Sequence, residues 1–233
     1  MEDLVQAIRA GDVAAVREIV AREPGLANAR LVGDRTALHV VTDWPGYFPE
    51  GPATVRALID AGADPDGGVD PERPRETPLH WAASSDDVEV AEALLDGGAA
   101  SDPGGGSIDG ATPLHNAVGY GCWHVARLLV ARGARVDALW VAAGLGLRDR
   151  VDELLAADPP TGRDDLDTAF WAACHGGQRR TAEHLLARGA DLNRVPDFTD
   201  QSPLDAAGGL DTRRGTLVDW LRERGARPAR PAG

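Results

Sequence analysis

The side chains that could do chemistry in this chain are six histidines, two cysteines and a large excess of carboxylates. Zinc sites take closely spaced His and Cys ligands, and these residues form no such cluster here. No Gly-x-Ser-x-Gly segment presents a nucleophilic serine, and neither Cys122 nor Cys174 has a motif that would activate its thiol. His175 could act as a general base with Asp86 or Asp43, but no fixed spacing joins them. The sequence therefore predicts no catalytic residue, no metal site and no cofactor.

Three of the histidines recur at one position of a repeated phrase. Residues 77–83 read Thr-Pro-Leu-His-Trp-Ala-Ala, and residues 112–118 read Thr-Pro-Leu-His-Asn-Ala-Val. His39, His80 and His115 share this position, so their periodicity indicates a structural role. Threonine followed by proline suits the start of a helix, since threonine can cap free N–H groups and proline at the first helical position loses no hydrogen bond.

Each copy of the phrase is followed by a second apolar stretch that ends in a pair of large residues. Five of the seven copies keep one spacing between the two, whereas the second copy has five extra residues and the last has one. The seven pairings are Leu4 with Ile19-Val20, Leu38 with Leu58-Ile59, Leu79 with Leu94-Leu95, Leu114 with Leu129-Val130, Leu139 with Leu154-Leu155, Phe170 with Leu185-Leu186, and Leu204 with Trp220-Leu221.

This layout resembles the ankyrin repeat over nearly the whole chain. The resemblance implies an all-α solenoid of about seven helix-turn-helix repeats with short hairpin fingers, in which the repeated imidazole hydrogen-bonds backbone between repeats. We expect one domain over residues 1–233. Its repeats are predicted at 1–33, 34–74, 75–109, 110–135, 136–165, 166–199 and 200–227, with a tail at 228–233.

Composition limits the partners that this chain can have. The formal net charge is −13 and all 24 basic residues are arginine, a bias that we attribute to a GC-rich, bacterial genome. A chain this acidic should repel nucleic acid and anionic lipid. No apolar run is long enough to cross a bilayer, and no secretory signal is recognised. We therefore expect a stand-alone cytoplasmic protein with buried, unpaired thiols, and a monomer because both ends of the array look solvated.

Function in a repeat protein is expected where the repeats deviate from their average. The insertion at residues 43–51 carries three of the eleven aromatic residues, and its prolines and glycines favour a loop. It could be a recognition loop or a lid over the next inner helix. The segment 61–76 holds Asp64, Asp66, Asp70 and Glu72 but lacks the pattern of a calcium loop, so we interpret it as a solvated finger. The connection before Asp137 is short, which leaves a notch that could admit a ligand or simply reflect drift.

The resemblance places the inner helices and fingers along a concave groove. We predict a noncatalytic protein–protein interaction module that binds a partner with a basic or neutral surface through this groove, where aromatic anchors alternate with short polar groups. The alternative is a small-molecule-binding protein or enzyme with a closed aromatic pocket over repeats two to four, built from Trp44, Tyr47, Phe48, Trp81 and Tyr120. The candidate partner-binding residues are Asp43, Trp44, Tyr47, Phe48, Trp81, Asp86, Asn116, Tyr120, Trp123 and His175.

Overall fold

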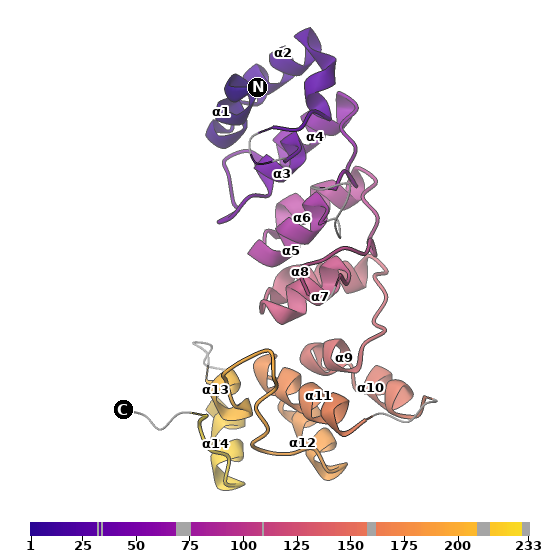
Figure 1. The fold of residues 1–233 in the computed structure, drawn as a ribbon, viewed down its shortest axis with the longest axis vertical. Helices are drawn as coiled ribbons and strands as arrows, with labels where there is room; N and C mark the ends of the chain where they lie inside the picture. Colours follow the sequence, from indigo (N-terminus) through magenta and orange to yellow (C-terminus); the bar gives the residue numbers. More distant parts are fainter. Residues whose placement is uncertain are drawn as a thin grey trace. The chain divides into compact units, whose positions relative to one another are not determined.

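The computed structural model describes residues 1–31, 33, 35–68, 76–108, 110–157, 162–208 and 215–229. Within these ranges the regular structure is helical, with the α-helices α1 to α14, the short 3-10 helix η1 and no strand (Figure 1). The chain forms two compact units, Met1–Arg135 and Val136–Gly233. The division between them falls at the predicted boundary between the fourth and fifth repeats.

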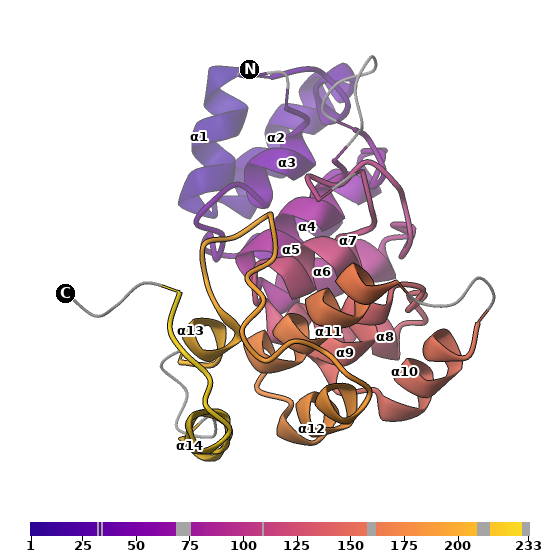
Figure 2. The same ribbon diagram turned by 60° about the horizontal axis from the view of Figure 1, so that its bottom comes forward.

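The first unit stacks four helix pairs in two layers (Figures 1 and 2). The inner helices α1, α3, α5 and α7 each contact the next in the series, and so do the outer helices α2, α4, α6 and α8. The bounds are α1 Glu2–Ala10, α2 Val13–Arg22, η1 Pro24–Ala27, α3 Ala37–Val41, α4 Gly51–Asp60, α5 Pro78–Ser85, α6 Val88–Asp96, α7 Pro113–Gly119 and α8 Trp123–Ala131.

The second unit contains three further pairs, with α11 packed against both α9 and α13. The backbone of Gly176, at the end of α11, lies close to that of Gly144 in α9. A Cβ atom on residue 176 would lie only 2.0 Å from the Gly144 carbonyl oxygen, so this approach requires glycine. The bounds are α9 Leu139–Leu145, α10 Arg148–Leu155, α11 Arg163–His175, α12 Arg179–Ala187, α13 Pro203–Ala207 and α14 Gly215–Glu223. The seven helix pairs confirm the predicted fold class. The single-domain division and its repeat limits stay predictions.

The core follows the apolar pattern of the repeats. The leucine of the repeated phrase is fully buried in the clear copies, as at Leu79 and Leu114, and so is the first residue of the following pair, as at Leu94 and Leu129. Ala82 is also fully buried, and such small side chains let neighbouring helices approach one another. Within each unit, the helix pairs therefore bury apolar surface against their neighbours as well as between their own two helices.

The repeated histidines cap their own helix and join it to the next repeat. His39 Nδ1 accepts from the Thr36 hydroxyl at 2.7 Å, and the His39 Nε2–H donates to the Glu76 carbonyl oxygen at 3.1 Å. His80 repeats the second bond to the Ala111 carbonyl, also at 3.1 Å. The structural role predicted for these two imidazoles is confirmed.

Trp171 shows how the second unit keeps this bond without a histidine. The indole occupies the same position of its repeat, and its Nε1–H donates to the Gln201 carbonyl oxygen at 2.9 Å. Gln201 stands directly before the helix cap Ser202, just as Glu76 stands before the cap Thr77. The replacement thus preserves the contact between neighbouring repeats.

The acidic finger uses its carboxylates to hold neighbouring loops in place. In this finger, residues 61–76, the Asp66 carboxylate accepts from the backbone N–H of Ala100 at 3.0 Å. In the next connection, between α6 and α7, the Asp102 carboxylate accepts in the same way from Arg135 at 3.0 Å. Asp70 and Glu72, the other predicted acids of this finger, lie outside the described residues. Within the described ranges, no helix is both long and apolar enough to cross a bilayer.

Candidate functional site

The predicted insertion forms a loop between α3 and α4. The backbone N–H of Tyr47 donates to Asp87 Oδ2 at 2.8 Å, and the Tyr47 hydroxyl donates to the Asp86 carbonyl oxygen at 2.6 Å. These bonds attach the loop to the turn between α5 and α6, yet Trp44 remains 81% exposed. The loop combines the contact expected of a lid with the exposure expected of a recognition loop.

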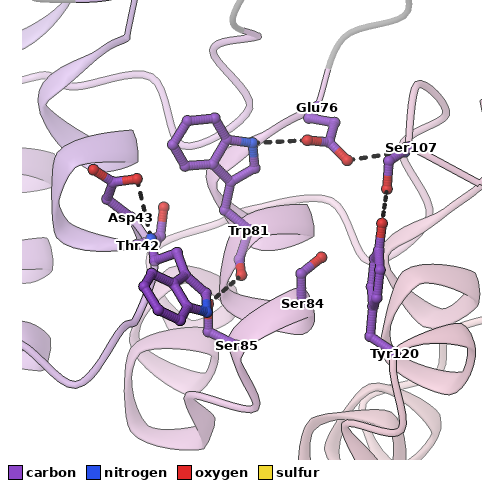
Figure 3. A pocket seen from close by; sticks show the side chains of 9 residues that line it. Thr42, Asp43, Glu76, Trp81, Ser84, Ser85, Ser107 and Tyr120 are labelled. Carbon is purple, nitrogen blue, oxygen red and sulfur yellow. Dashed lines mark hydrogen bonds between the residues drawn. The ribbon is translucent and has the colours of Figure 1, made fainter.

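Beside this loop lies an open hollow of about 280 Å³, which we call the aromatic hollow. Three aromatic side chains contribute to its wall. In Figure 3 the rings of Trp81 and Tyr120 lie on opposite sides of Ser84, with Glu76 and Ser107 near them. The lining residues are Thr42, Asp43, Trp44, Glu76, Trp81, Ser84, Ser85, Ser107 and Tyr120.

Glu76 holds two walls of the aromatic hollow in place. Its Oε2 accepts from the Trp81 indole N–H at 2.9 Å, and its Oε1 accepts from the Ser107 backbone N–H at 2.8 Å (Figure 3). Asn116 Nδ2 donates to the same Oε1 at 3.0 Å. The Ser107 and Tyr120 hydroxyls lie 3.1 Å apart, so the network extends to the second ring. The rings of Trp81 and Tyr120 are thereby positioned before any ligand arrives.

The serine and threonine hydroxyls of the aromatic hollow face it mainly as acceptors. Ser84 Oγ donates to the His80 carbonyl at 2.9 Å, and Ser85 Oγ donates to the Trp81 carbonyl at 3.2 Å. Thr42 Oγ1 likewise donates to backbone carbonyls of its own helix. Since each hydroxyl has a single hydrogen, these bonds leave only oxygen lone pairs for a ligand.

Trp81 is also held from the side of the second repeat. The Arg35 guanidinium lies 5.1 Å from the Trp81 ring centroid, and the His39 ring meets it edge-on at 5.0 Å. Arg35 in turn pairs with Asp43, whose carboxylate is 3.7 Å from Arg9 as well. Asp43 is therefore neutralised by two arginines of the fold.

The aromatic hollow brings together four of the predicted site residues: Asp43, Trp44, Trp81 and Tyr120. Tyr47 and Phe48 are not among its lining residues, so the proposed five-residue aromatic pocket was wrong in these two members. Tyr47 is instead bonded to the turn after α5, and Phe48 lines a separate surface depression beside α4 and α6. The cavity is also open rather than closed.

Three further predicted residues lie elsewhere or serve the fold. Asn116 was expected to be exposed in the groove, but it is fully buried, because its amide bridges Glu76 and Ser84 from below the surface. The Asp86 carboxylate accepts from the first backbone N–H groups of α8, on His124 at 3.0 Å and Val125 at 2.9 Å. Trp123 begins the outer helix α8 and is half-buried.

His175, the last predicted residue, belongs to the second unit. Its ring stacks on that of Trp171, with the ring centroids 4.9 Å apart. The Phe198 ring meets the Trp171 ring edge-on, at a centroid distance of 5.4 Å. Asp43 and Asp86, once considered as its carboxylate partners, belong to the first unit. His175 is thus part of an aromatic group on its own repeat stack.

Sequence reasoning missed Glu76, which organises the aromatic hollow. Glu76 directly precedes the repeated phrase that begins at Thr77, so it is not part of the pattern from which the repeats were identified. Ser107 and Ser84 were also missed, because their contribution comes from contacts between repeats. The sequence does place Glu76 five residues before Trp81. This spacing alone does not predict the hydrogen bond between the Trp81 indole N–H and the Glu76 carboxylate.

Neither thiol is disposed to react. Cys122 and Cys174 are buried and unpaired. Burial raises the pKa of Cys122 to about 11, and it raises the pKa of Cys174 as well. A raised pKa keeps a cysteine in the unreactive thiol form. Among the described residues, no group of three His, Cys, Asp or Glu side chains could hold a metal ion.

Comparison with known sequences gives matches to ankyrin-repeat families. A family model for ankyrin repeats in three copies matches residues 47–138, and one for a single ankyrin repeat matches residues 165–197. Together they cover more than half of the chain. The mouse B-cell lymphoma 3 protein homolog is 35% identical over 100 residues, which is 40% of this chain and 20% of that protein. Human neurogenic locus notch homolog protein 4 is 38% identical over 109 residues, 43% of this chain and 5% of that protein.

The matched part is thus a fifth or less of the length of these relatives. Among solved structures, the human ASB11 ankyrin repeat domain aligns over 98% of this chain and 99% of that one, with a TM-score of 0.56 and 24% identity. The ankyrin repeat domain of Bcl-3 aligns over 94% and 97%, with a TM-score of 0.52 and 26% identity. The first of these similarities establishes the fold alone.

Proposed function

The chain belongs to the ankyrin-repeat family, and on this basis we propose that it is a noncatalytic protein–protein interaction module. In this proposal a protein partner inserts a side chain into the aromatic hollow of the first unit. A cytoplasmic location, a monomeric state and a partner with a basic or neutral contact surface are parts of the same proposal. The curated relatives extend far beyond the matched region, so no individual partner is transferred from them.

The observation that carries this proposal is a set of aromatic rings around one hollow, of which Trp81 and Tyr120 are held by hydrogen bonds and Trp44 is exposed. Trp44 is 81% exposed and Tyr120 is 55% exposed, yet both line the same hollow as the half-buried Trp81. Binding energy in protein interfaces concentrates on such aromatic anchors. The Glu76 network supports the proposal further, because side chains that are already ordered lose less entropy on binding.

The size of the aromatic hollow favours a protein side chain over a separate small molecule. At about 280 Å³ and open to solvent, it lies at the lower limit of ligand pockets, which range from about 300 to 1,000 Å³ and bury most of their ligand. An open hollow of this size accommodates one anchor residue whose neighbours rest on the surrounding surface. The small-molecule alternative has no comparable observation in its favour.

The test compares two exposed aromatic residues, one in the aromatic hollow and one in the second unit. Partners would be captured with the wild-type chain, identified, purified and measured by calorimetry against Trp44→Ala and Phe198→Ala. We expect Trp44→Ala to weaken binding about tenfold or more, because an anchor residue contributes well over 1 kcal/mol. Phe198→Ala is the matched control, since Phe198 is 66% exposed but belongs to the second unit and does not line the aromatic hollow.

Equal binding by wild type and Trp44→Ala would refute the proposal, and so would a larger loss with Phe198→Ala. The net charge of −13 adds a second expectation for a basic partner. Association should slow as salt is raised, because screening removes the long-range attraction.

A further inference from the structure

We propose that the side chain received by the aromatic hollow is that of an arginine. This inference rests on the proposed function and specifies the chemistry of the partner's anchor residue. It follows from three features of the aromatic hollow: the hydrogen-bonding groups that remain available, the carboxylate at its edge and the behaviour of an arginine that the fold already contains.

Three hydroxyls in the lining of the aromatic hollow favour a ligand that donates hydrogen bonds, whereas the Ser107–Tyr120 hydroxyl pair keeps one hydrogen and the Trp44 indole N–H is a further donor. Thr42, Ser84 and Ser85 have given their hydroxyl hydrogens to helix carbonyls, so they offer only lone pairs. The Trp81 indole N–H and the Ser107 backbone N–H are already engaged by Glu76. A guanidinium carries five N–H donors and no acceptor, which matches this wall better than an amide or a hydroxyl does.

Glu76 supplies the negative charge that a cation would meet. Its described donors are the Trp81 indole, the Ser107 backbone and the Asn116 amide, none of which is charged. A carboxylate has about four lone-pair sites, so at least one remains for a further donor. Asp43 differs, because Arg9 and Arg35 already pair with it.

The fold contains an arginine in the arrangement that we propose for the ligand. Arg35 does not line the aromatic hollow, but its guanidinium lies 5.1 Å from the Trp81 centroid while it pairs with Asp43. An arginine thus combines an indole and a carboxylate at this site. Arginine also stacks on aromatic rings more readily than lysine does, because its guanidinium is planar and more weakly hydrated.

The inference can be tested with short peptides and NMR. The indole Nε1–H signals of Trp44 and Trp81 would be followed while the full chain is titrated with capped Gly-Arg-Gly, Gly-citrulline-Gly and Gly-Lys-Gly. Citrulline has nearly the shape of arginine but no charge. We expect saturable shifts with the arginine peptide and about two- to fivefold weaker binding of the citrulline peptide, the ratio expected of an exposed cation–π contact. The lysine peptide should bind more weakly than the arginine peptide.

Variants tie the signal to the aromatic hollow. Trp44→Ala should weaken arginine-peptide binding about two- to fivefold, measured through the Trp81 signal, whereas Phe198→Ala in the second unit should leave it unchanged. Glu76→Gln should weaken it too, and the signals of the other tryptophans report whether the variant keeps its fold. The second unit provides an internal reference, because its Trp140 signal should not move with the arginine peptide.

Three results would overturn the arginine assignment: equal binding of the citrulline peptide, equal or tighter binding of the lysine peptide, or no shift of either indole. The proposed function can survive each of them. If the purified protein partner still depends on Trp44 while citrulline binds as well as arginine, the anchor residue is uncharged and only this inference fails. If the arginine peptide binds while the protein partner ignores Trp44→Ala, the proposed function fails instead.

Discussion

Lowering the pH from 7 to 5 should destabilise the first unit through His39. This imidazole is fully buried, and its hydrogen bonds require the neutral ring. Nε2 must carry hydrogen because the Glu76 carbonyl can only accept, and Nδ1 must be bare because the Thr36 backbone N–H, 3.4 Å away, can only donate. Burial, the largest influence, lowers the His39 pKa from 6.5 to about 4.

The direction and size of the effect follow from the pKa difference. Between pH 6.5 and pH 4 the unfolded chain binds a proton at His39 that the folded chain excludes, so the free energy of unfolding falls as the pH falls through this window. With pKa values of 6.5 unfolded and about 4 folded, the loss between pH 7 and pH 5 is about 2 kcal/mol. His80 acts in the same direction, since burial lowers its pKa as well.

The assay is urea unfolding of the wild type and of His39→Gln at pH 7, 6 and 5. Glutamine stays neutral throughout and can still donate to the Glu76 carbonyl, so it removes the titration while keeping the main contact between repeats. The wild type should lose about 2 kcal/mol more than the variant between pH 7 and pH 5. NMR titration of the His39 ring gives the folded pKa directly.

Equal pH dependence of the two proteins would refute the reasoning, because every other titrating group is common to both. A folded His39 pKa near 6.5 would refute it as well. Either result would mean that the folded protein tolerates a protonated His39 ring. The Thr36 hydroxyl, for example, could rotate so that its oxygen accepts a hydrogen bond from Nδ1–H.

Two further changes test packing between repeats by urea unfolding. Gly106→Ala should cost about 1–3 kcal/mol, since its Cβ would lie 2.7 Å from the Ala111 carbonyl oxygen, whereas Gly104→Ala, with its nearest atom at 3.5 Å, should be nearly neutral. Equal stability of the two variants would show that the finger moves freely. Trp171→Phe should cost about 1 kcal/mol or more, because it leaves the Gln201 carbonyl without the indole donor at 2.9 Å. An unchanged unfolding midpoint would show that this bond contributes nothing.

Much of the fold could be predicted because its signals are local and repeated. The phrase around His80 predicts a helix start, a buried leucine and an imidazole directed at the next repeat, and all three were found. Trp44 and Trp81 were expected near each other because the insertion precedes the helix of Trp81, and both line one hollow. The part of the site that follows the repeat pattern was therefore accessible from the sequence.

The remainder depends on side chains from different repeats that meet only in three dimensions. Asn116 looked like an exposed groove residue, yet the finger that carries Ser107 bonds to the same Glu76 and the amide ends fully buried. Tyr47 looked like part of the pocket, but its hydroxyl turns to the Asp86 carbonyl. No spacing rule relates these residues, because their separations depend on the lengths of loops.

The sequence by itself determined the helix-turn-helix repeats, the structural histidines and the acidic charge. These depend on residue type and on contacts that recur in each repeat. The tertiary structure alone decided that Glu76 joins Trp81, Ser107 and Asn116 beside Tyr120, and that the Ser84 hydroxyl nearby offers only lone pairs. The physical reason is that hydrogen bonds are short and directional, so their partners are fixed only once neighbouring repeats have packed.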